Sequence, residues 1–291
     1  MQKVLVAIII AGTYLSLFLP LIVSPGVVYP FVLPKAVFFW VISEIIFFAW
    51  VVLAAVDKKF RPKENVLLYS VLLFVAMMAL ASYRGINPTI SIWSTLERMG
   101  GLITLIHGFL YFLVLSSVFW RFAQWRGLLT AAIFIGSAVS AFFFLGDHLP
   151  ITLPESRQGS TLGNSSFFGA YAIFPLFFSV LVMLKEKFGF LKLAAVAGFV
   201  FIYIAIYYAS SQAAFYGASG GLFLIFIAWL FFASPKASFL TGINFRKASI
   251  VFFVVGIVAA GVYGYGVILS NGGVKARTLV WEGAWKAAME R

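Results

Sequence analysis

The chain has 291 residues, of which 63% are hydrophobic and 10% are charged, and its formal net charge at pH 7 is +12. This composition and a mean hydropathy of +1.05 exclude an ordinary soluble domain and indicate an integral membrane protein. The absence of cysteine excludes disulfides, iron–sulfur clusters and thiolate zinc sites, and two histidines are too few for a histidine-rich metal centre, so we expect neither a metal nor a cofactor.

Nine apolar segments have roughly the length needed to cross a bilayer, which takes about 20 helical residues. We therefore expect an all-α fold, a polytopic transmembrane helical bundle with about nine spans. The first segment resembles a signal peptide, but it is longer than the apolar core of one and no A-x-A cleavage site follows, so we interpret it as a retained span. The expected spans lie near 4–23, 35–56, 65–83, 99–120, 127–145, 165–184, 193–209, 214–233 and 248–269.

Basic residues are concentrated in alternate joints between these segments. The joints DKKFRPKE (57–64), RFAQWR (121–126), KEKFGFLK (185–192) and SPKASFLTGINFRK (234–247), together with Lys3, hold most of the 21 lysines and arginines. The positive-inside rule then predicts a cytoplasmic N-terminus and an external C-terminus. The charge reflects topology and contact with membrane lipids, with no nucleic acid as partner. We divide the chain into a transmembrane helical domain, 1–269, and the start of an external (periplasmic) loop, 270–291.

Two ionisable residues lie within the apolar segments, and each has two interpretations. Glu44 is either a proton-relay carboxylate or a hydrogen-bonded residue of the interior. His107 is either functional or a packed residue that hydrogen-bonds between helices. A transporter would place such groups near the midplane, where its site is reached from both sides. The other polar residues collect in the external joints, which favours chemistry at that face.

The external stretch ESRQGSTLGNSSFFGAY (155–171) combines an arginine with a helix start. The Arg157 guanidinium can hold two phosphate oxygens, and glycines such as Gly163 let backbone N–H groups approach the same anion. Asn164 is placed to cap the helix that follows, whose N-terminal dipole would also attract an anion. The alternative is an interfacial arginine that binds lipid headgroups.

Three further external residues are candidates, each with a simpler alternative. Arg277 precedes an amphipathic helix with Trp281 and Trp285 on its apolar side, and is either a second phosphate ligand or part of a surface anchor. Arg98 is either an anion ligand or an ion-pair partner of the preceding Glu97 or of a neighbouring joint. His148 is either a base or a loop cap.

Three stretches together resemble the bacterial O-antigen ligase and O-antigen polymerase superfamily. NPTISIWSTLERMGGLITLIHGFLYF (87–112) resembles the family's Ser-x-Trp-x-x-x-x-Arg pattern and RQGSTLGNSSFFGAY (157–171) its Arg-x-x-x-Thr-x-Gly-Asn pattern. ARTLVWEGAWKAAMER (276–291) resembles the Arg-x-x-x-Trp opening of its major periplasmic loop. The order of the three stretches is that of the family.

The resemblance implies a metal-independent, inverting glycosyltransferase in the bacterial inner membrane. Its donor would be a glycan on undecaprenyl pyrophosphate, and its acceptor a lipid or a protein at the periplasmic side. Arg157 and Arg277 would correspond to the arginines that hold the donor pyrophosphate, with Arg98, Gly163 and Asn164 as further substrate-binding residues. Carried over to this chain, the family's catalytic histidine would lie beyond Arg291, so we identify no catalytic residue and expect the N-terminal portion of such a protein.

One short stretch departs from the family pattern: this chain has Gln212 and Ala213 where many relatives have Ser-Arg-Gly. Ligase, polymerase and protein-glycosylating activities are not separated by these residues. Two other classes stay open: a lipid-linked oligosaccharide flippase or other secondary transporter, and a non-catalytic membrane scaffold.

Overall fold

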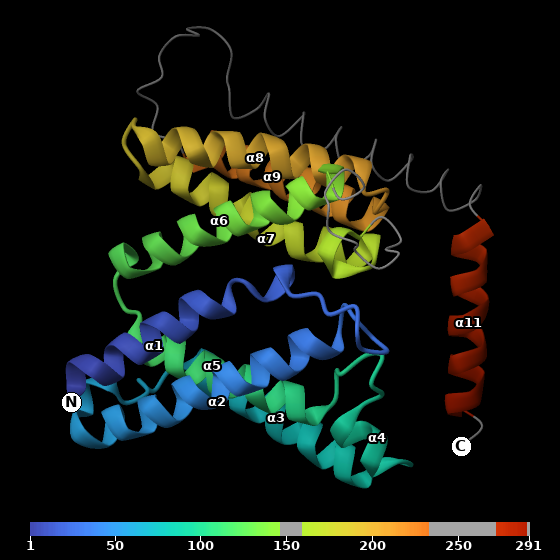
Figure 1. Ribbon diagram of the computed structural model, residues 1–291. Coiled ribbons are helices and arrows are strands. Elements are labelled where there is room, and N and C mark those ends of the chain that lie inside the picture. Colours follow the sequence, from blue (N-terminus) through green and yellow to red (C-terminus); the bar gives the residue numbers. More distant parts are fainter. Residues whose placement is uncertain (146–158, 233–271, 290–291) are drawn as a thin grey trace, which may run out of the picture. The chain divides into compact units, whose positions relative to one another are not determined.

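A computed structural model describes residues 1–145, 159–232 and 272–289 (Figure 1). All regular secondary structure in these ranges is helical. The chain divides into two compact units, Met1–Ala218 and Ser219–Arg291. The domain boundary expected after residue 269 falls inside the second unit, beside residues outside the described ranges, and it stays a prediction.

The first unit contains helices α1 to α8 and the start of α9. Each long helix corresponds to one apolar segment of the sequence, and three short 3₁₀ turns, η1 (Leu19–Leu21), η2 (Lys58–Phe60) and η4 (Ser160–Leu162), lie in the joints. The helices are α1 (Gln2–Ser16), α2 (Leu33–Val56), α3 (Val66–Arg84), α4 (Pro88–Trp93), α5 (Leu102–Val118), α6 (Phe122–Leu145), α7 (Ser165–Lys185), α8 (Phe190–Tyr208) and α9 (Gln212–Phe232).

Six helices in the described ranges are long and apolar enough to cross a membrane: α2, α3, α6, α7, α8 and residues Gln212–Trp229 of α9. Helices α1 and α5 are apolar but shorter. The protein is therefore an all-helical bundle of the multi-pass membrane type. The ninth expected span, 248–269, lies outside the described residues.

Several expected segment bounds differ from the helices; α6, for example, begins at Phe122, whereas residue 127 was expected. The first apolar run was expected to be helical to residue 23, but α1 ends at Ser16 and a 3₁₀ turn containing Pro20 follows. Proline lacks the N–H that would continue the helix, which accounts for the early end. The fourth segment was expected from residue 99, but α5 begins at Leu102, because Met99 has a positive φ of 48° and cannot belong to an α-helix.

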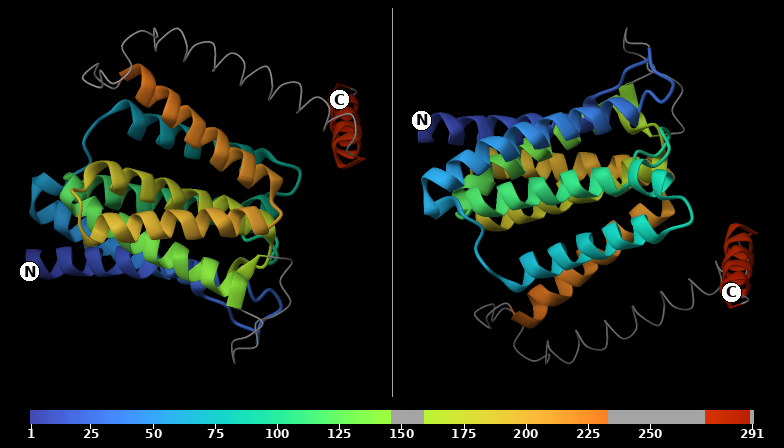
Figure 2. Two further views of the ribbon diagram at one scale, coloured as in Figure 1. Left: turned by 90° about the horizontal axis from the view of Figure 1, so that it is seen from above. Right: turned by 90° about the horizontal axis from the view of Figure 1, so that it is seen from below.

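The long helices form two packed groups (Figures 1 and 2). Helices α1, α2 and α5 pack together around Ile9, Ile46 and Val114, with α3 against α5. Helices α6, α7 and α8 pack around Val139, Phe168 and Ile202. Many large apolar side chains on the outer faces stay exposed, especially along α3. Such faces are typical of helices in contact with lipid.

Small residues allow the second group to pack closely. At Gly136 of α6 an added Cβ would lie 2.7 Å from Pro175 of α7, and at Gly198 of α8 it would lie 2.7 Å from Ile133 of α6. Glycine at such crossings lets two helix backbones approach, the usual solution in membrane bundles.

We predict that Gly136→Ala destabilises the bundle by about 1–3 kcal/mol, because the added methyl group overpacks the α6–α7 contact. The matched control is Gly108→Ala in α5, where an added Cβ meets nothing within 4 Å. Alanine favours a helix over glycine by about 1 kcal/mol, so the control should be neutral or stabilising. Thermal unfolding of the purified protein in detergent measures both; equal melting temperatures for the two variants would contradict the close contact.

Candidate functional site

Three of the joints rich in lysine and arginine meet at one end of the first unit. The Nζ atoms of Lys59 and Lys63 lie 5.1 and 5.3 Å from the centre of the Trp120 ring. The Nε atom of Arg126 lies 2.8 Å from a carboxylate oxygen of Glu186. Joints 57–64, 121–126 and 185–192 are thus neighbours, as the alternation of basic joints predicts for one membrane face.

At the other end, three of the remaining joints surround a cavity of about 390 Å³. We call it the Arg98 cavity. Its walls come from the turn before α2, from the joint between α4 and α5, and from the start of α7. The lining residues are Tyr29, Pro30, Phe31, Val32, Glu97, Arg98, Leu162, Gly163, Asn164, Ser166 and Phe167. Three residues proposed from the sequence, Arg98, Gly163 and Asn164, are therefore brought together.

The Arg98 side chain is exposed and, within the described ranges, makes no hydrogen bond or ion pair. The ion pair expected between Glu97 and Arg98 is not formed, although both residues line the cavity. The backbone around them is irregular, with positive φ angles at Ser94 and Met99 on either side. This irregular turn sets the two side chains apart and leaves the guanidinium available to a ligand.

Asn164 caps α7, as expected. Its side-chain oxygen accepts the backbone N–H of Ser166 at 2.8 Å. The positive end of the helix dipole favours an anion at a helix start. The start of α7 therefore adds to the attraction of Arg98 for an anion.

Gly163 fits its position for two reasons. Its φ of +74° is a left-handed conformation that glycine adopts without strain. A Cβ at this position would lie 2.5 Å from the ring of Phe31, so the α7 entrance packs directly against the turn before α2. Two walls of the cavity are joined at this contact.

Lys35 joins the same two walls by hydrogen bonds, which sequence reasoning missed. Its ammonium group donates to the carbonyl oxygens of Phe31 and Thr161, both at 2.8 Å. Only 8% of the residue is exposed. The sequence presents Lys35 only as a lysine of an external joint, because its partner Thr161 is 126 residues away.

The structure leaves three expected residues untested. Arg157 and His148 lie outside the described residues. Arg277 lies in α11 (Gly272–Met289), which belongs to the second unit, so its meeting with Arg157 stays a prediction. The helix itself confirms the expected helical segment there, and an i,i+4 ion pair of 2.9 Å joins Lys286 to Glu282.

Glu44 and His107 bond to one another between α2 and α5, which confirms the interpretation of His107 as an interhelical hydrogen-bonding residue. The His107 Nε2 atom lies 3.1 Å from a carboxylate oxygen of Glu44, and Nδ1 lies 2.7 Å from the carbonyl oxygen of Ile103. The His107 side chain is 11% exposed and that of Glu44 54%. Because a carbonyl oxygen only accepts, Nδ1 is the donor in the contact with Ile103.

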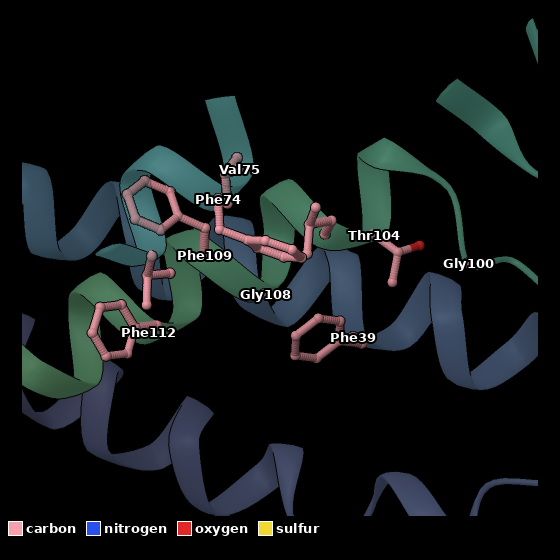
Figure 3. A pocket seen from close by; sticks show the side chains of 10 residues that line it. Phe39, Phe74, Val75, Gly100, Thr104, Gly108, Phe109 and Phe112 are labelled. Atoms are coloured by element: carbon pink, nitrogen blue, oxygen red, sulfur yellow. The ribbon is translucent and has the colours of Figure 1, made fainter. Parts of the chain in front are cut away.

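Two other cavities in the first unit are mainly apolar. One, of about 480 Å³, opens between α2, α3 and α5, with rings of Phe39, Phe74, Phe109 and Phe112 around it (Figure 3). The other, of about 300 Å³, is lined by aromatic residues and by Ser16, whose hydroxyl lies 2.7 Å from that of Tyr111. Within the described ranges, no three histidine, cysteine or acidic residues could together hold a metal ion.

Comparison of the chain with protein-family models, curated proteins and solved structures finds no match.

We predict that Gly163→Ala disrupts the Arg98 cavity and destabilises the protein by about 1–3 kcal/mol, because alanine is strained at this φ and its methyl group overlaps the Phe31 ring. The double variant Gly163→Ala/Phe31→Ala removes the overlap but keeps the strain, so it should recover part of the loss. Thermal unfolding in detergent measures both. No recovery in the double variant would contradict the Gly163–Phe31 contact.

Proposed function

We propose that this protein is a membrane-embedded glycosyltransferase of the O-antigen ligase type. Its donor is a glycan carried on undecaprenyl pyrophosphate, its acceptor is a lipid or a protein, and the transfer takes place at the periplasmic face of the bacterial inner membrane. The proposal rests on the sequence resemblance of three stretches and on the Arg98 cavity, which supplies a place for the anionic headgroup.

One observation carries the proposal. The Arg98 cavity gathers residues from two of the three stretches that show the resemblance, Arg98 from the first and Gly163 and Asn164 from the second. The two stretches are far apart in sequence, and their meeting at one cavity supports a common site. The Arg98 guanidinium, which has no ion pair with the described residues, and the positive end of the α7 dipole both favour an anion there.

The arrangement suits the departure of a pyrophosphate. As the glycosidic bond breaks, negative charge grows on the leaving group, and a fixed guanidinium and helix N–H groups stabilise that charge without reorganising. An acceptor hydroxyl that attacks the opposite face of the anomeric carbon gives inversion. Holding donor and acceptor at one membrane face supplies proximity. No residue described in the structure is assigned as the base for the acceptor hydroxyl.

The transporter alternative finds less support. Glu44 and His107 form an ionisable pair within the spans, but neither lines any of the three cavities described above. A transporter would be expected to face such a pair into its substrate path.

We predict opposite effects for the two charged residues of the cavity. Arg98→Gln should weaken binding of radiolabelled undecaprenyl-pyrophosphate glycan about tenfold or more, since a charged hydrogen bond contributes about 1.5–3 kcal/mol. Glu97→Gln should tighten binding, because it removes a negative charge beside the headgroup. Equilibrium binding to the purified protein with a metal chelator present measures both effects.

The matched control is Arg84→Gln, an exposed arginine at the end of α3 that does not line the cavity. It should leave binding unchanged. Arg157→Ala and Arg277→Ala, tested in the same assay, should weaken binding if both arginines hold the donor. Equal binding by the Arg98→Gln, Arg157→Ala and Arg277→Ala variants and the wild type would reject the proposal.

The proposed orientation is tested by labelling, because the chain contains no cysteine to interfere. Ser166→Cys, in the Arg98 cavity, should react with a membrane-impermeant maleimide added to spheroplasts, in which only the periplasmic face is accessible. Lys59→Cys, at the opposite end, should react only after the membrane is opened. The reverse pattern would place the cavity at the cytoplasmic face and contradict periplasmic transfer.

A further inference from the structure

Lys35 is a buried cation without a described anionic partner. Its ammonium group uses two of its three hydrogens for the carbonyl oxygens of Phe31 and Thr161 and lies 5.8 Å from the centre of the Phe31 ring. No ion pair joins it to a carboxylate in the described part of the chain. A buried charge is costly unless an opposite charge lies near it, so this position favours an anion in the neighbouring space.

The residues that Lys35 bonds are the walls of the Arg98 cavity. Phe31 itself lines the cavity, and Thr161 directly precedes Leu162 and Gly163, which also line it. The hydroxyl of Thr161 is buried, with the residue 2% exposed, and has no hydrogen-bond partner among the described residues. Buried hydroxyl groups nearly always have a partner, and an orphaned one beside a buried ammonium indicates that a polar group completes this wall.

The charges on the cavity lining do not by themselves make an anion site. The lining includes one carboxylate, Glu97, and one guanidinium, Arg98, so their formal charges cancel. The positive balance depends on the start of α7 and on the ammonium group behind the wall. The sign of the electrostatic potential in the Arg98 cavity therefore depends on the charge of Lys35.

We infer that Lys35 is the positioning residue that holds the two walls of the Arg98 cavity together and makes it select a pyrophosphate headgroup over a monophosphate. This inference rests on the proposed function, since it concerns the same anion. The two hydrogen bonds fix Phe31 and the turn before α7. The positive charge of Lys35 attracts the ligand more strongly as the ligand's negative charge increases. A purely structural role would affect both headgroups alike.

The test compares two probes with the same lipid chain, whose headgroups differ by one phosphate group and its charge. The wild-type protein in detergent should bind farnesyl pyrophosphate more tightly than farnesyl monophosphate. Lys35→Met should lose about tenfold in affinity for the pyrophosphate and clearly less for the monophosphate, so the ratio of the two affinities falls. Lys35→Arg, which keeps the charge, should restore the ratio. Lys59→Met, at the opposite end of the bundle, is the matched control and should leave the ratio unchanged.

The outcomes separate this inference from the proposed function. Equal loss for both probes in Lys35→Met, or an unchanged ratio, overturns the selective role of Lys35 even when the wild type binds pyrophosphate. If Lys35→Met does not fold, Lys35→Gln, which keeps one donor without the charge, must show the fallen ratio, and an unchanged ratio there overturns the inference. Failure of the wild type to bind either probe rejects the proposed function, and the inference with it. Inorganic pyrophosphate binding as tightly as the farnesyl form would keep Lys35 in its role and reject the lipid carrier.

Discussion

In a hydrocarbon environment every backbone N–H and C=O group must find its partner within the protein, and this constraint organises the whole structure. It keeps the spans helical and confines irregular backbone to the ends of the bundle. The Arg98 cavity arises where that irregular backbone collects: the turn with positive φ at Ser94 and Met99, and the turn at Gly163 before α7. Polar and charged side chains from three joints meet at these turns, and the proposed binding site lies there.

The fold was largely predictable because its signals are local. Apolar runs of spanning length and the alternation of basic joints place the helices and group their ends, and Asn164 is recognisable as a cap from its place before an apolar run. The predicted end of the first helix was wrong because two local signals conflict there. The apolar run indicates a continuing helix, whereas Pro20 within it ends the helix. Local reasoning also failed at Glu97 and Arg98, where adjacent opposite charges suggest an ion pair that the irregular backbone does not form.

The candidate site was only partly predictable because its walls are distant in sequence. Arg98, Gly163 and Asn164 were found from residue chemistry and from the family resemblance. Lys35 was not, because its role depends on a carbonyl 126 residues away and on a backbone contact between Phe31 and Gly163. No composition or periodicity signal marks a lysine whose partners are backbone oxygens. Such a residue becomes visible only when tertiary contacts are known.

The long separation between Lys35 and Thr161 has a consequence for biosynthesis. Chains fold from the N-terminus as they are made, so helices α1 to α5 are complete well before Thr161 emerges from the ribosome. Until then the Lys35 ammonium group has Phe31 as its acceptor and lacks the second. The Arg98 cavity therefore cannot close before the start of α7 has been made, and a shorter chain carries helices α1 to α5 without the second wall.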